Sequence, residues 1–144
     1  MAGCACALGL RLLGFIIAMD TYGLRPSARN APRPLMDLNQ RFMYPQVVRS
    51  GHFDAAIFGT STLRLLDPQN LGKATGFRFA NLAMNAATPW EQTRIAALFA
   101  REVDQPKAVI WGIDPTWCEA DATSAAKQLT PRPFPPWLYE QTGW

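Results

Sequence analysis

Residues 53–68 constrain the fold of this chain more than any other stretch. Residues 53–58 form a short run that is apolar apart from Asp54, and Gly59 ends it. Ser61 follows at the start of a predicted helical turn that ends at Leu66. A short buried strand, a tight turn and a serine at the mouth of a helix are typical of α/β proteins, in which ligands bind beyond the carboxyl ends of the strands. The same pattern is an ordinary strand-to-helix connection, so Ser61 is a candidate nucleophile only if the chain supplies partners for it.

The composition suits one folded domain. The chain has 144 residues, 49% hydrophobic and 17% charged, which is enough apolar material for one core and is not typical of a disordered protein. The net charge is +3 without a dense cluster of lysine and arginine, so we expect no nucleic-acid partner. His52 is the only histidine, and Cys4, Cys6 and Cys118 lack zinc-ligand spacing. We therefore expect free thiols, no metal and no cofactor.

Two further apolar runs predict two more strands, at residues 77–82 and 108–111. Between them, Thr88, Pro89 and Glu91 have the residue types and spacing of a capped helix start. That helix is expected to end before Pro106. Alternating strands and helices predict an α/β fold, a partial three-layer sheet with parallel strands and flanking helices, preceded by an apolar N-terminal helix.

Weaker signals complete the prediction. We expect a short helix within residues 35–50, broken at Pro45, and we expect Asp67 and Pro68 to stop the turn that begins at Ser61. Residues 72–76 are predicted to be loop and residues 121–127 a helical turn. The proline-rich tail is predicted to be extended, with aromatic side chains that pack on other parts of the chain. These are Phe134, Trp137, Tyr139 and Trp144.

The chain is accordingly divided into four segments. They are an apolar anchor or signal segment (1–19), a linker and short helix (20–50), the α/β core (51–118) and a tail rich in proline and aromatic residues (119–144). About three strands are few for a doubly wound domain. We therefore expect the tail to be truncated and the chain to be part of a longer protein.

Residues 1–19 are about as long as a bilayer crossing, although Arg11 lies near their middle. They are compatible with a membrane anchor, with a secretory signal cleaved near Ala18, or with a helix that packs on protein. We expect a membrane anchor that holds the domain outside the cytoplasm. The orientation stays open, because Arg25, Arg29 and Arg33 follow the segment and the positive-inside rule would place the domain in the cytoplasm.

Polar or small residues follow each predicted strand and would converge at one edge of a parallel sheet. Besides Ser61, they are Asn81 after the second strand, Asn85 and Ala86 in the loop beyond it, and Asp114 after the third strand. A serine nucleophile needs a base and donors for an oxyanion, and these residues are candidates for donors and substrate contacts. Each has an ordinary structural interpretation too: Ser61 as a helix cap, Asn81 as a strand-end residue bonded to backbone, and Asp114 as a loop aspartate.

The strand ends resemble the sequence blocks of SGNH/GDSL-type hydrolases. Asp-Ala-Ala-Ile-Phe-Gly-Thr-Ser-Thr at 54–62, followed by Leu-Asp-Pro at 66–68, resembles the first block. Residues 81–91 resemble the second block, and Ile-Trp-Gly-Ile-Asp at 110–114 is similar to the third. Asp-Thr-Tyr-Gly at 20–23, after an apolar segment, is similar to a bacterial branch of membrane-anchored SGNH-like proteins. The resemblance covers residues 20–118 and implies an SGNH/flavodoxin-like fold held at the bacterial inner membrane.

The resemblance implies that Ser61 is the nucleophile and that acyl groups or acetylated carbohydrates are the substrates. Asn85 and Ala86 stand where the family has a glycine whose backbone N–H is a donor. Asp114 stands where the family has an asparagine, and an ionised carboxylate cannot donate a hydrogen bond. The final block, with an aspartate and a histidine close together, is absent from this sequence. His52 cannot replace it, because it lies roughly 20 Å from Ser61 if the first strand is extended.

Two hypotheses follow. The first is the N-terminal part of an SGNH-like hydrolase or acyl transferase domain, inactive alone because triad catalysis fails without a histidine. The second is a non-catalytic α/β protein whose strand-end residues bind a ligand or a partner. A fragment that does not fold stably is a third possibility.

Overall fold

The computed structural model describes residues 2–19, 40–124 and 133–140, with side chains from residue 6 onward in the first of these segments. The chain divides into two units, Met1–Met36 and Asp37–Trp144. Helix α1 spans Ala2–Met19 in the first unit. Among the described residues, no helix has both the length and the apolar character needed to cross a membrane. The predicted linker at 20–34, the end of the predicted turn at 121–127 and Trp144 lie outside the described residues.

The second unit is built on a three-stranded parallel sheet, as predicted. Its strands are β1 (Ala55–Phe58), β2 (Phe79–Asn81) and β3 (Ala108–Trp111), in the order β2-β1-β3. Ala55 lies opposite Phe79 on one side and opposite Ala108 on the other, so the three strands end at the same edge. The central strand is buried throughout, which explains why it is a continuous apolar run rather than an alternating one.

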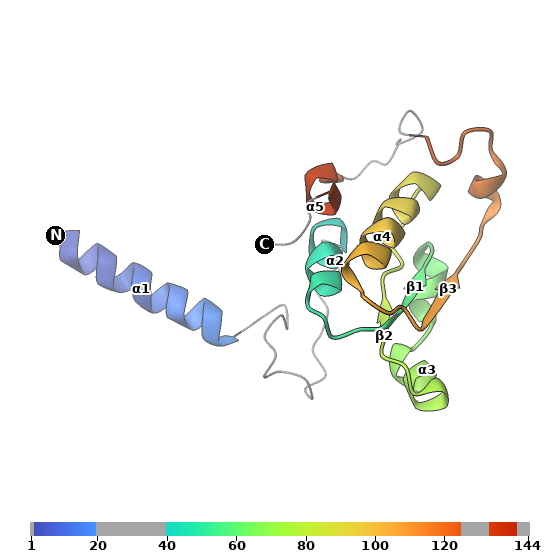
Figure 1. Cartoon of the computed structure of the whole chain (residues 1–144). Coiled ribbons are helices and arrows are strands. Elements are labelled where there is room, and N and C mark those ends of the chain that lie inside the picture. The colour runs from blue at the N-terminus through green and yellow to red at the C-terminus, as the bar shows by residue number, and fades with distance from the viewer. Residues whose placement is uncertain (1, 20–39, 125–132, 141–144) are drawn as a thin grey trace. The chain divides into compact units, whose positions relative to one another are not determined.

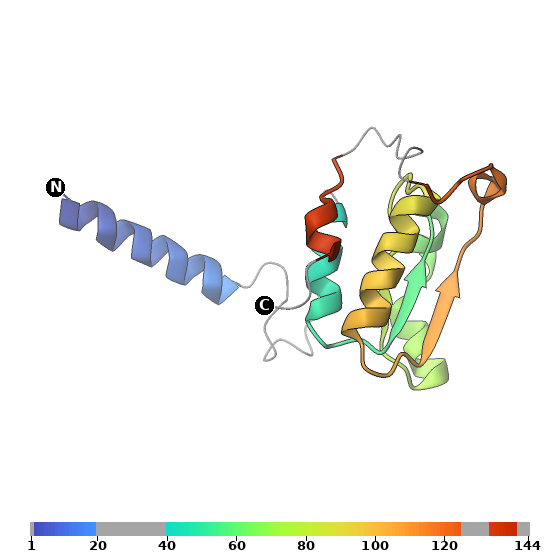
Figure 2. The ribbon, with the colours of Figure 1, turned by 45° about the horizontal axis from the view of Figure 1, so that its top comes forward.

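Helices flank the sheet on both faces (Figures 1 and 2). Helices α2 (Gln40–Arg49), α4 (Pro89–Glu102) and α5 (Pro136–Glu140) cover one face. The short 3-10 helix η2 (Ser61–Leu65) and helix α3 (Pro68–Thr75) contribute to the other. Ala56 and Phe58 of β1 point into the larger core beneath α2, α4 and α5, whereas Ala55 and Ile57 point into the smaller one.

The capped helix start predicted at Thr88 is confirmed. The Thr88 hydroxyl accepts from the N–H of Glu91, and the Glu91 carboxylate accepts from the N–H of Thr88. Proline occupies the first helical position, where a missing N–H costs nothing because that group would have no helical partner. Helix α4 runs from there to Glu102 and places Ile95, Leu98 and Phe99 in the larger core.

The predicted break at Pro45 is wrong. Helix α2 continues through Pro45 to Arg49. A proline has no N–H to donate to the carbonyl four residues earlier, which here belongs to Arg41. The Tyr139 hydroxyl of α5 donates to that carbonyl instead, at 2.7 Å. Burial, with a smaller contribution from the Glu91 carboxylate, raises the pKa of the Tyr139 hydroxyl, so the group stays protonated and remains a donor. A residue distant in sequence thus replaces the missing helical hydrogen bond.

The prediction that Asp67 and Pro68 stop the turn that begins at Ser61 is confirmed, because η2 ends at Leu65 and both Leu66 and Asp67 have an extended backbone. The prediction that residues 72–76 are loop is wrong, because a further helix, α3, runs to Thr75. Asp67 is the N-cap of α3, and its carboxylate accepts from the N–H of Gln69 at 2.8 Å. Pro68 occupies the first turn of that helix, as Pro89 does in α4. The helix ends at Thr75, and Gly76 adopts the left-handed backbone (φ 78°) of a C-cap. The same cap-and-proline signal therefore begins both helices.

The described end of the tail is partly helical rather than extended. Residues 136–140 form α5, in which Leu138 and Tyr139 are buried. The prediction that the tail aromatics pack on the chain is confirmed for two of them. Phe134 stacks on Tyr139, with ring centroids 4.3 Å apart, and meets the ring of Trp90 edge-on at 4.9 Å. The tail thus closes the larger core over α2 and α4.

Tyr139→Phe tests the contact that replaces the missing helical bond. Removing the hydroxyl leaves the buried Arg41 carbonyl without a donor, so we expect the free energy of unfolding to fall by about 1–3 kcal/mol. Urea denaturation of the full chain measures it. Trp137→Phe is the matched control, since Trp137 lies in the same helix but is 55% exposed, and it should change stability by less than about 0.5 kcal/mol. Equal losses in the two variants would contradict the assignment.

Candidate functional site

Ser61 lies beyond the carboxyl end of the central strand. Gly59 ends β1, Thr60 occupies the N-cap position of η2, and Ser61 is the first residue of that helix. The ordinary structural interpretation of Ser61 as the helix cap is therefore wrong, because Thr60 occupies the cap position. Its side chain is exposed, and within the described part of the chain its hydroxyl has no hydrogen-bond partner. This leaves the hydroxyl available for chemistry or for a ligand.

Leu63 fixes η2 against the ends of two strands. A Cβ atom on Gly112, just after β3, would lie 2.2 Å from Leu63 Cδ2, and one on Gly59 would lie 2.9 Å from Leu63 Cγ. Real Cβ atoms do not approach other atoms so closely, so both positions need glycine for this side chain to fit. The predicted convergence of strand ends is therefore found around Leu63.

Asn81, at the end of β2, has a structural role. Its side-chain amide donates to the carbonyls of Leu63 and Leu66, each at 3.0 Å, and its oxygen accepts from the N–H of Ala83 at 3.2 Å. Both amide hydrogens and the oxygen are therefore engaged. This agrees with the ordinary interpretation of Asn81 as a strand-end residue bonded to backbone, and it makes Asn81 a poor candidate for a substrate contact.

The loop of residues 84–87 lies directly beside the turn after β1. The N–H of Met84 donates to the Gly59 carbonyl at 3.0 Å, and the N–H of Ala87 donates back to Met84 at 3.2 Å. Asn85 uses its own N–H for Gln40 (2.8 Å) and its side-chain oxygen for the Arg64 guanidinium (3.0 Å). The backbone donor predicted at Asn85 is thus already occupied, whereas the N–H of Ala86 has no partner within the described residues.

Ala86 adopts a left-handed backbone, with φ 50°. This conformation is unfavourable for a residue with a Cβ and is the one in which glycine is favoured. The site therefore keeps the backbone geometry of a glycine position while carrying alanine. Surrounding contacts must hold the loop in this shape, because the residue does not prefer it.

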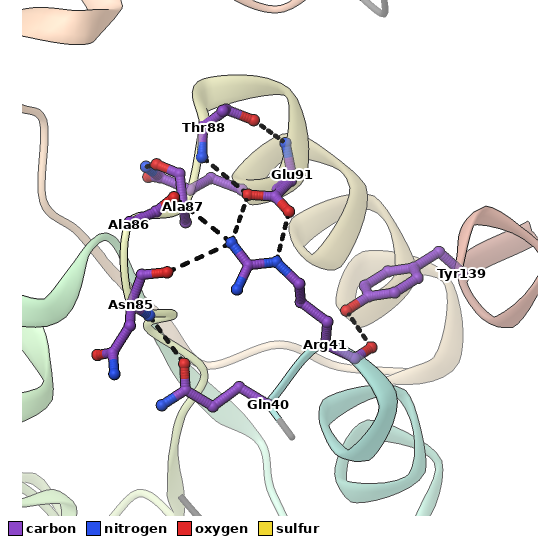
Figure 3. Close-up of polar contacts among 9 residues, drawn as sticks. Gln40, Arg41, Asn85, Ala86, Ala87, Thr88, Glu91 and Tyr139 are labelled. Carbon is purple, nitrogen blue, oxygen red and sulfur yellow. Dashed lines mark hydrogen bonds and ion pairs between the residues drawn. The ribbon is translucent and has the colours of Figure 1, made fainter. Parts of the chain in front are cut away.

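A buried ion pair supplies those contacts (Figure 3). The Arg41 guanidinium meets the Glu91 carboxylate through two parallel hydrogen bonds, Nε–Oε1 at 2.6 Å and Nη2–Oε2 at 2.9 Å. Their side chains are only 4% and 0% exposed. The same Nη2 also lies 3.3 Å from the carbonyl oxygen of Asn85 and 3.4 Å from that of Ala86. One arginine thus joins α2 to the start of α4 and to the 84–87 loop.

Asp114 caps a short helix rather than pointing to a vacant site. Its carboxylate accepts from the N–H of Thr116 at 3.2 Å and from the Thr116 hydroxyl, at the start of η3 (Pro115–Cys118). Gly112, two residues earlier, is the part of this strand end that contacts η2. The structure therefore gives Asp114 the role of a helix cap, whereas its ordinary interpretation was that of a loop aspartate.

Within the described residues, the one histidine of the sequence does not lie beside Ser61. His52 precedes the amino end of β1, whereas Ser61 follows the carboxyl end. Asp54, also before the amino end of β1, pairs with Arg78. Burial acts to raise the pKa of Asp54, but the hydrogen bonds and the charge of Arg78 outweigh it and hold the pKa below its ordinary value. Within the described residues, no group of three or more histidine, cysteine, aspartate or glutamate side chains could hold a metal ion.

Comparisons with protein-family models, with curated proteins and with solved structures found no match to this chain. Sequence reasoning missed Arg41, the residue that holds the candidate site together. Its partner Glu91 was assigned only to the helix cap. The signal available in the sequence was the position of Arg41, four residues before Pro45. A proline inside a helix leaves the carbonyl at that position without its helical donor, so other contacts must replace it.

Ala86→Gly tests the left-handed backbone. Glycine removes the roughly 1–2 kcal/mol cost of that conformation, which offsets its own unfolded-state entropy of about 0.5–1 kcal/mol. We expect the variant to be as stable as the natural chain or up to about 1 kcal/mol more stable. Ala97→Gly, on the exposed side of α4, is the control and should lose about 1 kcal/mol. Equal losses in urea denaturation would show that Ala86 is not left-handed.

Gly112→Ala tests the packing of Leu63. The added methyl group overlaps the Leu63 side chain, so we expect a loss of about 1–3 kcal/mol. Leu63→Ala should remove the overlap, and the double variant should be more stable than the sum of the single losses predicts, by about 0.5–3 kcal/mol. A double-mutant cycle in urea measures this coupling, and additive losses would contradict the contact.

Proposed function

We propose that this chain carries the nucleophile side of an SGNH-like hydrolase or acyl transferase domain, with Ser61 attacking acyl or acetyl groups, including those on carbohydrates. The observation that supports it most is the exposed Ser61 hydroxyl, without a partner in the described chain, beyond the central strand. The 84–87 loop is bonded to the turn before Ser61, and its Ala86 N–H has no partner among the described residues. A hydroxyl and a backbone donor at one sheet edge are two of the parts that acyl transfer needs.

The missing part is the base. A serine hydroxyl is a weak nucleophile until a neighbouring group accepts its proton. His52, at the far end of β1, does not fill this role. In this proposal the described residues bind the acyl group and present the serine hydroxyl to it. Catalytic turnover is slow unless a group outside these residues accepts the serine proton.

The N-terminal segment extends the proposal to location. We propose that α1 attaches the domain to a bacterial inner membrane, with the domain on the extracytoplasmic side. The support is the apolar sequence of α1, interrupted only by Arg11. The orientation rests on the family resemblance, since Arg25, Arg29 and Arg33 follow the segment and favour the opposite one.

A non-catalytic α/β protein that binds a ligand or partner is the second candidate. Two observations favour it. Asn81 and Asp114, both candidates for substrate contacts, are engaged in hydrogen bonds that hold η2 and η3 in place. In this alternative, the strand-end edge binds without reacting, and Ser61 contributes a hydrogen bond only.

Chemical rescue separates the two candidates. The full chain is treated with a fluorophosphonate, with and without imidazole in solution. At Ser61 the serine oxygen bonds to phosphorus, fluoride leaves, and imidazole takes the hydroxyl proton. We expect imidazole to raise the labelling rate at Ser61 about tenfold, because it supplies the base. Peptide mass spectrometry follows the rate at each serine.

Ser61→Ala and the half-buried Ser124 serve as controls. The variant should lose the imidazole-dependent labelling, and Ser124 should react slowly with or without imidazole. If Ser61 reacts no faster than Ser124 at any imidazole concentration, the nucleophile assignment is wrong and the binding protein is the better hypothesis.

A further inference from the structure

The peptide group between Asn85 and Ala86 has a fixed direction. Its carbonyl oxygen lies 3.3 Å from Arg41 Nη2. The described chain contains no cis peptide, and in a trans peptide the N–H points opposite to the C=O. The N–H of Ala86 therefore points away from Arg41. Arg41 lies on one side of the loop, so the Ala86 N–H is directed to the opposite side.

The other side of the loop faces η2. The side chain of Asn85 extends away from Arg41 (Figure 3) and accepts from Arg64 of η2 at 3.0 Å. The N–H of Met84 bonds to Gly59, two residues before Ser61. The loop thus lies between Arg41 and η2. An N–H that points away from Arg41 is directed to the side on which η2 carries Ser61.

Arg41 is itself held rigidly. Glu91 binds it through both carboxylate oxygens, and Oε2 of Glu91 also accepts from the N–H of Thr88. The Arg41 carbonyl accepts from Tyr139. The side chain is almost fully buried, so it has little freedom to choose another partner. A planar guanidinium can meet a carboxylate and two carbonyls at once, whereas the single ammonium of a lysine cannot keep that fork geometry.

We propose that Arg41 is a positioning residue for an oxyanion donor. It holds the carbonyls of Asn85 and Ala86, keeps Ala86 in its left-handed backbone, and so presents the N–H of Ala86 beside Ser61. The inference rests on the proposed function, since the donor serves the negatively charged oxygen that forms when Ser61 attacks. Arg41 touches neither substrate nor reacting atoms, and it acts only through this peptide.

The test is Arg41→Lys in the full chain, followed by two measurements. The first is the nuclear Overhauser cross-peak between the N–H and Hα protons of Ala86. This cross-peak is strong when φ is positive, because the two protons are then close in space. The second is binding of phenylboronic acid, followed by ¹¹B NMR and by the shift of the Ala86 amide. Ser61 Oγ bonds to boron, its proton goes to the buffer, and the boron becomes tetrahedral and anionic, with an oxygen for the Ala86 N–H to bind.

We expect Arg41→Lys to weaken the Ala86 cross-peak and to weaken phenylboronic acid binding about tenfold, because the donor is no longer held toward the anion. Arg49→Lys is the matched control. It alters another helix α2 arginine, which binds the Leu138 carbonyl at 2.8 Å and lies away from the loop. It should lower stability without changing either measurement.

The outcomes separate the two proposals. If Arg41→Lys stays folded and keeps both the Ala86 cross-peak and the boronate affinity, the positioning role is overturned. If Arg49→Lys weakens both as much as Arg41→Lys does, the effect is one of general stability and the role is overturned as well. If the natural chain has the Ala86 cross-peak but forms no adduct at Ser61, the proposed function fails, and the cross-peak in Arg41→Lys alone decides whether Arg41 sets the loop.

Discussion

The buried ion pair between Arg41 and Glu91 constrains the second unit more than any other single interaction. A guanidinium removed from water is costly unless a carboxylate and further acceptors surround it. Here Glu91 provides both oxygens, the 84–87 loop provides two carbonyls, and Tyr139 binds the arginine's own carbonyl. These partners lie 44 to 98 residues away in sequence. The stability of each connected element therefore depends on the others: helix α2, the cap of α4, the 84–87 loop and α5. Displacing any one of them would leave a buried polar group without its hydrogen-bond partner.

The apolar framework imposes a second constraint at the same edge of the sheet. Leu63 fills the space beside Gly59 and Gly112, so the glycines that end β1 and follow β3 are needed for packing. Asn81 then holds η2 in place by donating to the carbonyls of Leu63 and of Leu66, the C-cap of that helix. The strand-end residues that resemble catalytic motifs thus have packing roles of their own. A motif match at these positions is weaker evidence for chemistry than the spacing alone indicates.

Local sequence patterns predicted the helices and strands whose formation depends mainly on neighbouring residues. The second and third strands and the cap of α4 follow from short apolar runs, turn residues and capping spacing, and all are present in the structure. Helix α3 was predictable by the same reasoning, because Asp67-Pro68 repeats the signal of Thr88-Pro89, but the pair was interpreted only as the end of the preceding turn. The continuity of α2 through Pro45 was not predictable locally, because the compensating donor is Tyr139. The same limit hid Arg41, whose role appears only when distant elements pack.

The candidate site combines a strong part and a missing one. The strong part is electrostatic. The backbone N–H of Ala86 has no partner among the described residues, and it belongs to a loop whose carbonyls face a buried cation. That loop is bonded to Gly59, two residues before the exposed Ser61. Preorganised donors of this kind contribute much of the stabilisation of an acyl-transfer transition state, and they do so without help from a base. The missing part is proton transfer, which positioned groups accelerate by roughly 10²–10⁴. Under the proposed function, the described residues hold one donor, the N–H of Ala86, in an unfavourable backbone conformation and so support binding of a developing anion. Any activity of these residues therefore depends on where the proton goes.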